Sequence, residues 1–350
     1  MRVFDYSRLV HMNWPMDIVN LVAKIREYKG RQELFVRQKP VELNRLIEIA
    51  KIQSTEASNK IEGIVTTNTR IKQLVEDKTR PRNRDEDEIM GYRDVLKTIH
   101  ENHEYIPLKS TYILQLHRDL YRYSGRTYAG KFKNIQNYIT ETSGDGTSAI
   151  RFTPLSPSET PLAIEALCKS YEEMIAYDVV DPLILIPTFI SDFLCIHPFN
   201  DGNGRMSRLL TLLLLYKSGF MVGKYISLEK EIEKTKEVYY ETLVAIDEDW
   251  HEGTNDPLPF IRYMLKIILT CYEAFEERVN VINFAGHRSS AYDVVRQYVE
   301  TKIGKFTSAD VLVNCPRVGR SSALNALKKL TDEGIIARFG TGKSTYYVKI

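Results

Sequence analysis

Two apolar segments flank one short polar motif, and this arrangement constrains the fold more than any other feature of the sequence. The segment "PLILIPTFISDFLCI", at 182–196, is apolar almost all round, and "RLLTLLLLYKSG", at 208–219, is nearly as apolar. A helix that is apolar on every side has to be buried in a protein core. Asp181 and Pro182 suit the N-cap and first helical position of the first segment. The sequence therefore predicts two buried central helices, joined by a polar connection.

The rest of the chain is predicted to be mainly helical, with one hairpin. Apolar residues recur at helical spacing from about Met16 to Glu76, as in "ELNRLIEIAKIQSTEASNKIEG". The charged stretch "EDKTRPRNRDEDE", at 76–88, is expected to be a solvated connection. Near 135–153, β-branched and aromatic residues lie on both sides of a Gly-rich turn, which predicts a hairpin. We expect a mainly α fold in three parts, at 1–88, 89–280 and 286–350.

The last part of the chain has a character of its own. Three short helical patterns are followed by two strand patterns, "IIARFG" and "STYYVKI", which is the order of a winged helix-turn-helix domain (α+β). Residues 286–350 hold eleven Lys or Arg against five Asp or Glu, whereas the whole chain has a net charge of only +2. DNA is therefore a candidate partner, and the same unit could instead dock protein or form a homodimer. The basic side chains expected on DNA are Arg317, Arg320, Lys328, Lys329, Arg338 and Lys343.

Composition excludes some classes of protein. The four cysteines lack C-x-x-C spacing, so a secreted disulfide framework is not expected, and a reducing compartment is. The amino terminus lacks the apolar core of a signal peptide, and no apolar run approaches the length of a membrane span. We expect a cytoplasmic protein that does not contact a membrane. The histidines His100, His103, His117 and His251 show no metal-ligand spacing and are expected to be structural or surface residues.

The polar motif between the two apolar helices, "HPFNDGNGRMSR" at 197–208, has the composition of a phosphate site. Gly202 and Gly204, on either side of Asn203, allow a sharp turn that points several backbone N–H groups at one anion. A helix that begins here adds its N-terminal dipole. Arg205 and Arg208 follow as residues i and i+3, so both are expected to lean toward the same polyphosphate.

Two further residues of the motif indicate a reaction. Asp201 offers a hard oxygen ligand for Mg²⁺, which commonly bridges a carboxylate and substrate phosphates. His197 ends the first buried helix, and its ordinary pKa of about 6.5 suits a general base for an incoming hydroxyl. A base beside a bound polyphosphate favours attack by an activated hydroxyl on a phosphorus atom. The alternative is a capped turn followed by an ordinary charged helix.

The same twelve residues resemble the Fic motif, HPFx[DE]GNGRxxR, at every defined position. Proteins of the Fic (Fic/DOC) family typically transfer AMP from ATP to a Ser, Thr or Tyr hydroxyl of a target protein. The resemblance implies a Fic catalytic domain at 89–280, Mg²⁺ with ATP as co-substrate, and the same roles for the motif residues as their chemistry suggests. It further implies that the hairpin near 135–153 is a flap that pairs with the target, and that Tyr239 or Tyr240, in "KEVYYETL", lies against the adenine.

A second motif lies upstream, where "SNKIEG" at 58–63 resembles the inhibitory pattern [ST]xxxE[GN] of many Fic proteins. The resemblance implies that Ser58 and Glu62 belong to an inhibitory helix, and that Glu62 pairs with Arg208 and so removes the arginine that should hold the γ-phosphate. Self-modification and removal of AMP from the target are further activities that the resemblance allows. Two other functions stay open, namely a DNA-binding regulator that carries a Fic-like domain, and transfer of UMP, phosphate or phosphocholine.

Overall fold

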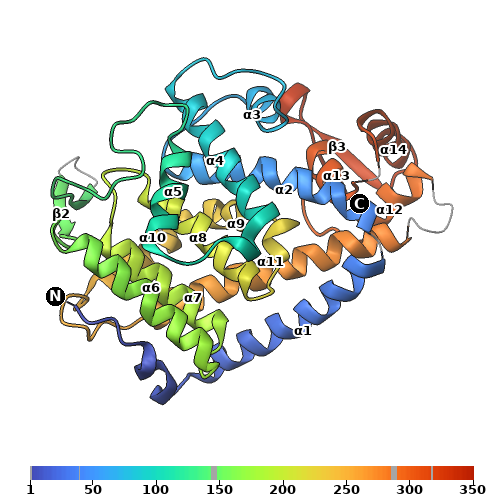
Figure 1. Cartoon of the computed structure of the whole chain (residues 1–350). Helices are drawn as coiled ribbons and strands as arrows, with labels where there is room; N and C mark the ends of the chain where they lie inside the picture. The colour runs from blue at the N-terminus through green and yellow to red at the C-terminus, as the bar shows by residue number, and fades with distance from the viewer. Residues whose placement is uncertain (1, 39, 143–147, 285–289, 317) are drawn as a thin grey trace.

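The computed structural model describes residues 2–38, 40–142, 148–284, 290–316 and 318–350. Figure 1 shows a mainly helical molecule with two small hairpins. The helices are α1 (Met16–Gln38), α2 (Pro40–Ile61), α3 (Asn68–Val75), α4 (Arg84–Asn102), α5 (Ser110–Leu120), α6 (Thr160–Tyr177), α7 (Pro182–Ile196), α8 (Asn203–Lys217), α9 (Leu228–Lys234), α10 (Lys236–Asp247), α11 (Leu258–Phe284), α12 (Ala291–Thr301), α13 (Ser308–Asn314) and α14 (Arg320–Asp332). The strands are β1 (Ile139–Thr142), β2 (Ser148–Phe152), β3 (Ile336–Phe339) and β4 (Tyr346–Lys349). The short 3-10 turns are η1 (Tyr6–His11), η2 (His103–Tyr105), η3 (Val222–Lys224) and η4 (Gly342–Ser344).

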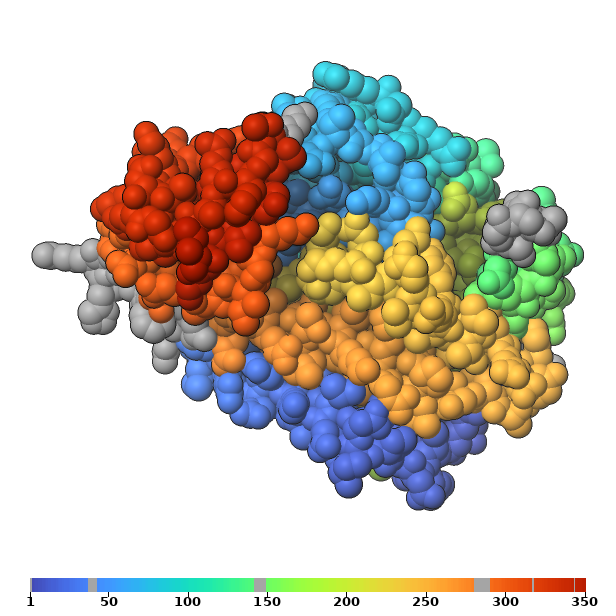
Figure 2. All heavy atoms as spheres, turned by 180° about the vertical axis from the view of Figure 1, so that it is seen from behind, coloured from blue at the N-terminus to red at the C-terminus, as the bar shows by residue number. Residues whose placement is uncertain are grey.

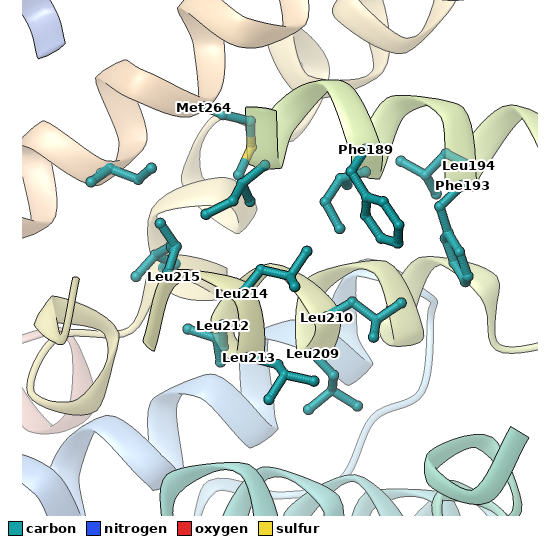
Figure 3. Packing of buried hydrophobic residues seen from close by; sticks show 14 of the residues in the cluster. Phe189, Phe193, Leu194, Leu209, Leu210, Leu212, Leu213, Leu214, Leu215 and Met264 are labelled. Carbon is teal, nitrogen blue, oxygen red and sulfur yellow. The ribbon is translucent and has the colours of Figure 1, made fainter. Parts of the chain in front are cut away.

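The prediction of two buried central helices is confirmed. Every residue of α7 from Leu183 to Ile196 is buried, and α8 is buried over most of its length. The Asp181 carboxylate caps α7 by accepting a hydrogen bond from the Leu183 backbone N–H at 2.9 Å. Leucines of α8 pack between α7 and the neighbouring helices, as Figure 3 shows. These two helices fix where the connection between them lies, because neither end can move without opening the core.

The amino-terminal helices belong to the same core. α1 packs along α11, while α2 packs against α9 and α4. One continuous hydrophobic cluster takes in residues from Phe4 to Val279. The amino-terminal region is therefore held against the central helices by apolar burial over a large area.

The expectation of a solvated connection at 76–88 is wrong at its carboxyl end. α4 begins at Arg84, where the Asn83 side chain caps it by accepting a hydrogen bond from the Glu86 N–H at 2.9 Å. Glu86 and Glu88 are buried, and Glu86 forms an ion pair with Arg70. Buried arginines make these positions favourable for carboxylates, which composition alone does not reveal. The division between 88 and 89 consequently falls inside α4.

The two hairpins lie at opposite ends of the molecule. β1 pairs antiparallel with β2, with Thr140 opposite Ile150, while the turn at 143–147 lies outside the described residues. The second hairpin, β3 with β4, belongs to the carboxyl-terminal residues. There, α12, α13, α14 and the hairpin share a small hydrophobic cluster of their own. Residues 286–289 of the predicted third part are also outside the description, and Figures 1 and 2 show the rest as a lobe far from β1 and β2.

In the described part of the chain, no helix combines the length and apolar character that crossing a bilayer requires.

Truncating a buried leucine of α8 should show how much the packing of α7 and α8 contributes to the stability of the fold. Leu213→Ala should lower the free energy of unfolding by about 2–5 kcal/mol, since the buried leucine leaves a cavity. Leu162→Ala is the control, because Leu162 is 58% exposed on α6 and should change stability by only about 0.5 kcal/mol. Urea unfolding followed by circular dichroism measures both. Equal losses from the two variants would contradict the central position of α8.

Candidate active site

The connection between α7 and α8 is a sharply turned loop held by its own side chains. His197 leaves α7 in the left-handed region, with φ 50° and ψ 61°, and Gly202 has φ 85°. The Asn203 side chain accepts a hydrogen bond from the Phe199 N–H at 2.9 Å and donates one to the Phe199 carbonyl at 2.8 Å. A side chain at Gly202 would meet the Tyr121 hydroxyl. The asparagine that the sequence places in a phosphate cradle thus also locks the loop.

A second set of contacts to this loop comes from the segment before β1. Lys133 Nζ donates to the Ile196 carbonyl at 3.0 Å. Asn137 Nδ2 donates to the carbonyls of His197 at 3.1 Å and Phe199 at 3.0 Å. These bonds satisfy carbonyls at the end of α7 and stabilise the unusual backbone at His197. Sequence reasoning missed both residues, because their partners are backbone atoms about 60 positions away.

His197 is set up as a neutral base. Its Nδ1 lies 3.1 Å from the Leu194 carbonyl, which can only accept, so Nδ1 carries the proton and Nε2 keeps a lone pair. Burial lowers the pKa of His197 to about 4, and the Lys133 ammonium acts in the same direction. The imidazole is therefore unprotonated at neutral pH.

A cavity of about 520 Å³ opens beside His197. Its walls come from the loop at 197–204 (the anion loop), from α10 and from the β1–β2 hairpin. α10 contributes five apolar or aromatic residues and three acidic ones. The volume is in the range of small-molecule sites. Of the residues that the sequence singles out, the cavity brings together Glu62, His197, Asp201, Gly202, Asn203, Gly204, Arg208, Tyr239 and Tyr240.

The two tyrosines differ in their surroundings. Tyr239 is 3% exposed and packs against Phe260 and Tyr263 at ring-centroid distances of 6.2 and 5.7 Å. Tyr240 is 38% exposed and has the Lys236 ammonium over its ring. Tyr240 is consequently the better placed of the two to offer an open ring face to a planar group.

Arg205 lies elsewhere than the sequence suggests. It is 1% exposed, and its Nη2 lies 2.9 Å from a Glu88 carboxylate oxygen and 2.7 Å from the Tyr121 hydroxyl, to which it donates. It does not line the cavity, so the structure does not bring Arg205 and Arg208 to one place. Glu88 is 2% exposed at its side chain and draws the guanidinium toward α4, because a buried carboxylate needs a charged partner.

Arg208 is held by Ser58 and Glu62, the two residues that the sequence assigns to an inhibitory motif. Its Nε donates to the Ser58 hydroxyl at 2.8 Å, and its Nη2 donates to the Ser58 carbonyl at 2.9 Å and to the Glu62 carboxylate at 2.8 Å. The Arg208 side chain is 3% exposed and the Glu62 side chain 32% exposed. A Cβ added at Gly204 would collide with the Glu62 carboxylate. Glu62 therefore lies directly on the anion loop, with its charge facing the cavity.

Asp201 is held in place from α5. The Gly130 N–H donates to His117 Nδ1 at 3.0 Å, which puts the His117 proton on Nε2, and Nε2 donates to the Asp201 carbonyl at 3.1 Å. Burial lowers the pKa of His117 to about 4, so the ring stays neutral. His117 also stacks on Phe199, with ring centroids 3.7 Å apart. The prediction that His117 is structural holds, but its contact with Asp201 could not be read from the sequence.

The residues present fit a Mg²⁺ ion that is bound mainly through a substrate. The Asp201 carboxylate is 46% exposed and lines the cavity beside the loop. Within the described ranges, no three His, Cys, Asp or Glu side chains are grouped so that they could hold a metal. One carboxylate beside a phosphate cradle suits Mg²⁺, which usually keeps waters and phosphate oxygens as its other ligands.

The hairpin over the cavity is anchored to the other wall. Arg151 on β2 lies 3.0 Å from the Asp247 carboxylate at the end of α10, and both side chains are largely buried. Beside them, His251 Nε2 lies 2.9 Å from the Thr153 carbonyl. Burial raises the pKa of Asp247 to about 6, although Arg151 opposes the shift. Neither Arg151 nor Asp247 was predicted, since an ion pair between a strand and a helix almost 100 residues apart leaves no local pattern.

Comparison with known proteins matches the central part of this site to a family. Residues 107–215 match the model of the Fic/DOC family. Protein adenylyltransferase fic-1 of Caenorhabditis elegans is 26% identical over 188 residues, which cover 52% of this chain and 32% of that protein. Protein adenylyltransferase Fic of Nematostella vectensis is 24% identical over 247 residues, covering 67% of this chain and 50% of that protein. The chain thus spans half or less of the length of these curated relatives.

Solved structures agree on the fold. A Fic family protein from Desulfovibrio desulfuricans G20 superposes with a TM-score of 0.61 at 20% identity and covers 97% of both chains. Fic-1 from Caenorhabditis elegans superposes with a TM-score of 0.58 at 20% identity, covering 76% of this chain and 74% of that chain. Residues 107–215, which include the anion loop, therefore match the Fic/DOC family, and the chain shares its fold with solved Fic proteins.

Proposed function

We propose that the protein is an adenylyltransferase that transfers AMP from ATP to a Ser, Thr or Tyr hydroxyl of a protein. The observation that carries the proposal is the neutral His197, whose free Nε2 lies in the same cavity as the glycine-rich loop at the start of α8. The two curated relatives, both named protein adenylyltransferases, support it. Transfer of UMP, phosphate or phosphocholine is the competing reaction.

The proposed chemistry uses groups already described. The backbone N–H groups at Gly202–Gly204 bind the phosphates at the start of α8. Mg²⁺, held by Asp201 and phosphate oxygens, would neutralise part of their charge. His197 Nε2 accepts the proton of the target hydroxyl as the hydroxyl oxygen forms a bond to the α-phosphorus. The bond from that phosphorus to the bridging oxygen breaks, and pyrophosphate leaves with the electron pair.

We further propose that Glu62 inhibits this reaction. Arg208 is the cavity's arginine on α8, and Glu62 and Ser58 occupy its Nη2 and Nε donors. A γ-phosphate would have to displace the Glu62 carboxylate, which repels it. ATP then binds only in a pose unsuited to attack.

The hairpin is proposed to receive the target. β1 and β2 form a two-stranded sheet in the described part of the chain, so an outer edge is available for an extended segment. Main-chain pairing at such an edge positions a hydroxyl with little demand on the target's sequence. Thr140 and Glu141, which both line the cavity, lie on the strand that would guide it.

Releasing Arg208 should activate the enzyme. Glu62→Gly should raise incorporation of label from α-³²P ATP into protein by roughly tenfold or more, since a charged hydrogen bond of about 1.5–3 kcal/mol is removed. His197→Ala in the Glu62→Gly background should abolish the gain. Glu56→Gln, a loss of charge earlier on α2, is the control and should change little.

Mass spectrometry of the labelled product identifies the transferred group and shows whether the modified protein is the chain itself. An added mass other than that of AMP would replace the proposed reaction by one of its competitors. Unchanged incorporation in Glu62→Gly would reject the inhibitory role of Glu62.

The pH dependence should reflect a base with a depressed pKa. A group needed in its neutral form loses activity as the pH falls through its folded-state pKa, so kcat/KM should fall near pH 4 for His197, well below its ordinary 6.5. Protonation of Asp247, whose pKa is raised to about 6, would loosen the hairpin and so add a first decrease in kcat/KM near pH 6. In the Glu62→Gly background, Asp247→Asn should remove any decrease in kcat/KM near pH 6 and keep the decrease near pH 4. An inflection that persists near pH 6.5 would show that the pKa of His197 is not depressed.

Loosening Asp201 should weaken the response to magnesium. His117→Ala removes the hydrogen bond to the Asp201 carbonyl, and the Mg²⁺ concentration for half-maximal activity in the Glu62→Gly background should rise by roughly 10–100-fold. His103→Ala, a partly exposed histidine away from the loop, should leave it unchanged. Titrating Mg²⁺ at fixed ATP measures both. A drop in maximal rate with no change in the Mg²⁺ midpoint would mean that His117 supports only the fold.

A further inference from the structure

The outer face of α14 is open along its whole length. The helix buries Ala323, Ala326, Leu327 and Leu330 against the small carboxyl-terminal cluster. Between these positions, the opposite face exposes Arg320, Ser321, Leu324, Asn325 and Lys328. Its packing partners are α12, α13 and β3, and Figure 2 shows these carboxyl-terminal residues as a lobe at one end of the molecule. A helix carried in this way can enter a groove without moving any other element.

The charges of this lobe are separated between its faces. Asp293 and Asp310 are used in capping boxes at the starts of α12 and α13. Glu300 pairs with Arg296, and Glu333 lies beside Lys329 and the Tyr292 hydroxyl. Four of the five carboxylates of residues 286–350 are therefore engaged within the lobe, and the fifth, Asp332, is exposed at the carboxyl end of α14.

The basic residues of the open face remain available. Arg320, Lys328 and Arg338 form no ion pair with any residue in the described ranges. Lys329, by contrast, lies over the Tyr292 ring, with Nζ 4.2 Å from the centroid, and 3.9 Å from Glu333. Lys329 thus belongs to the other face, which corrects its expected place on DNA. Arg317 and the side chain of Lys343 lie outside the described residues.

We propose that residues 290–350 form a winged helix-turn-helix module that binds duplex DNA. α13 and α14 are the helix-turn-helix, α14 lies in the major groove, and the β3–β4 hairpin is the wing. Arg320 and Lys328 contact phosphates through α14, and Arg338 contacts them through the wing. Ser321 and Asn325 face the base edges, where hydroxyl and amide groups can bond to bases.

Bound DNA would leave the catalytic cavity free. The β1–β2 hairpin lines the cavity. In both views this hairpin lies at the end of the molecule opposite the carboxyl-terminal lobe. The two activities can therefore coexist, and the DNA-binding function does not depend on the proposed transferase reaction.

The test compares two double variants of the full chain that are matched in charge and composition. Arg320→Ala with Lys328→Ala removes one arginine and one lysine from the open face. Arg296→Ala with Lys329→Ala removes the same pair from residues that already face carboxylates. Fluorescence anisotropy with a labelled mixed-sequence duplex of about three helical turns, between 50 and 200 mM salt, gives affinity and its salt dependence.

We expect the wild-type chain to bind the duplex and to lose affinity as salt rises. The open-face double variant should bind roughly tenfold or more weakly, with a salt slope reduced by about 2, because each lost phosphate contact removes about 0.9. The control pair should bind within about twofold of wild type. Incorporation of AMP, measured separately, should be the same in both variants.

Three results would overturn the proposal. The first is absence of salt-dependent binding by the wild-type chain, and the second is equal binding by the two double variants. The third is tighter binding of a matched RNA duplex or single strand, which would make RNA the ligand. Leu324 is 45% exposed at the centre of the face. If Leu324→Ala converts a dimer to a monomer in light scattering while DNA binding is absent, the face is a protein interface.

Discussion

Two buried guanidinium groups on one helix account for much of the architecture around the site. Arg205 and Arg208 are 1% and 3% exposed on α8, and a charge so deeply buried requires an opposite charge close by. Glu88, itself buried on α4, pairs with Arg205 and is shielded from the cavity. Glu62, after α2, pairs with Arg208 but stays partly exposed and lines the cavity. Arg205 is consequently structural, whereas the partner of Arg208 is open to the cavity, as the proposed exchange for a phosphate requires.

The way α2 is attached favours a local release over removal of the helix. The Ser54 hydroxyl bonds to that of Ser227, which donates to buried Glu229, and the Lys236 ammonium donates to the Ile61 carbonyl next to Glu62. Dislodging α2 would expose this network and the apolar contacts around it, at a cost far above that of one ion pair. Rotation of the Glu62 side chain breaks its bond to Arg208, the one hydrogen bond of that side chain within the described ranges. The proposed inhibitory contact would therefore yield to a ligand, although the helix that precedes Glu62 is firmly held.

The sequence predicts this site unevenly, for physical reasons. The two apolar helices and the glycine-rich loop follow from local periodicity and backbone freedom, and the pairing of Glu62 with Arg208 follows from motif resemblance. The different positions of Arg205 and Arg208 could not be predicted from the sequence, because they depend on Glu88. Glu88 lies in a charged stretch whose composition is typical of a solvated connection. His117, Lys133 and Asn137 act on backbone carbonyls, which any sequence provides. Such contacts become visible only when the chain is folded.

Burial disfavours the charged form of two groups in the same cavity, with opposite consequences for the site. At His197 it disfavours the imidazolium and leaves a base ready at neutral pH, and the hydrogen bond at Nδ1 directs the free lone pair outward. At Asp247 it disfavours the carboxylate that anchors the hairpin through Arg151. As the pH falls, the anchor on β2 is therefore weakened before the base is protonated. The hairpin that would receive the target is therefore the more pH-sensitive part of the site, because it is anchored by the Asp247 carboxylate, whose pKa of about 6 is close to neutral pH.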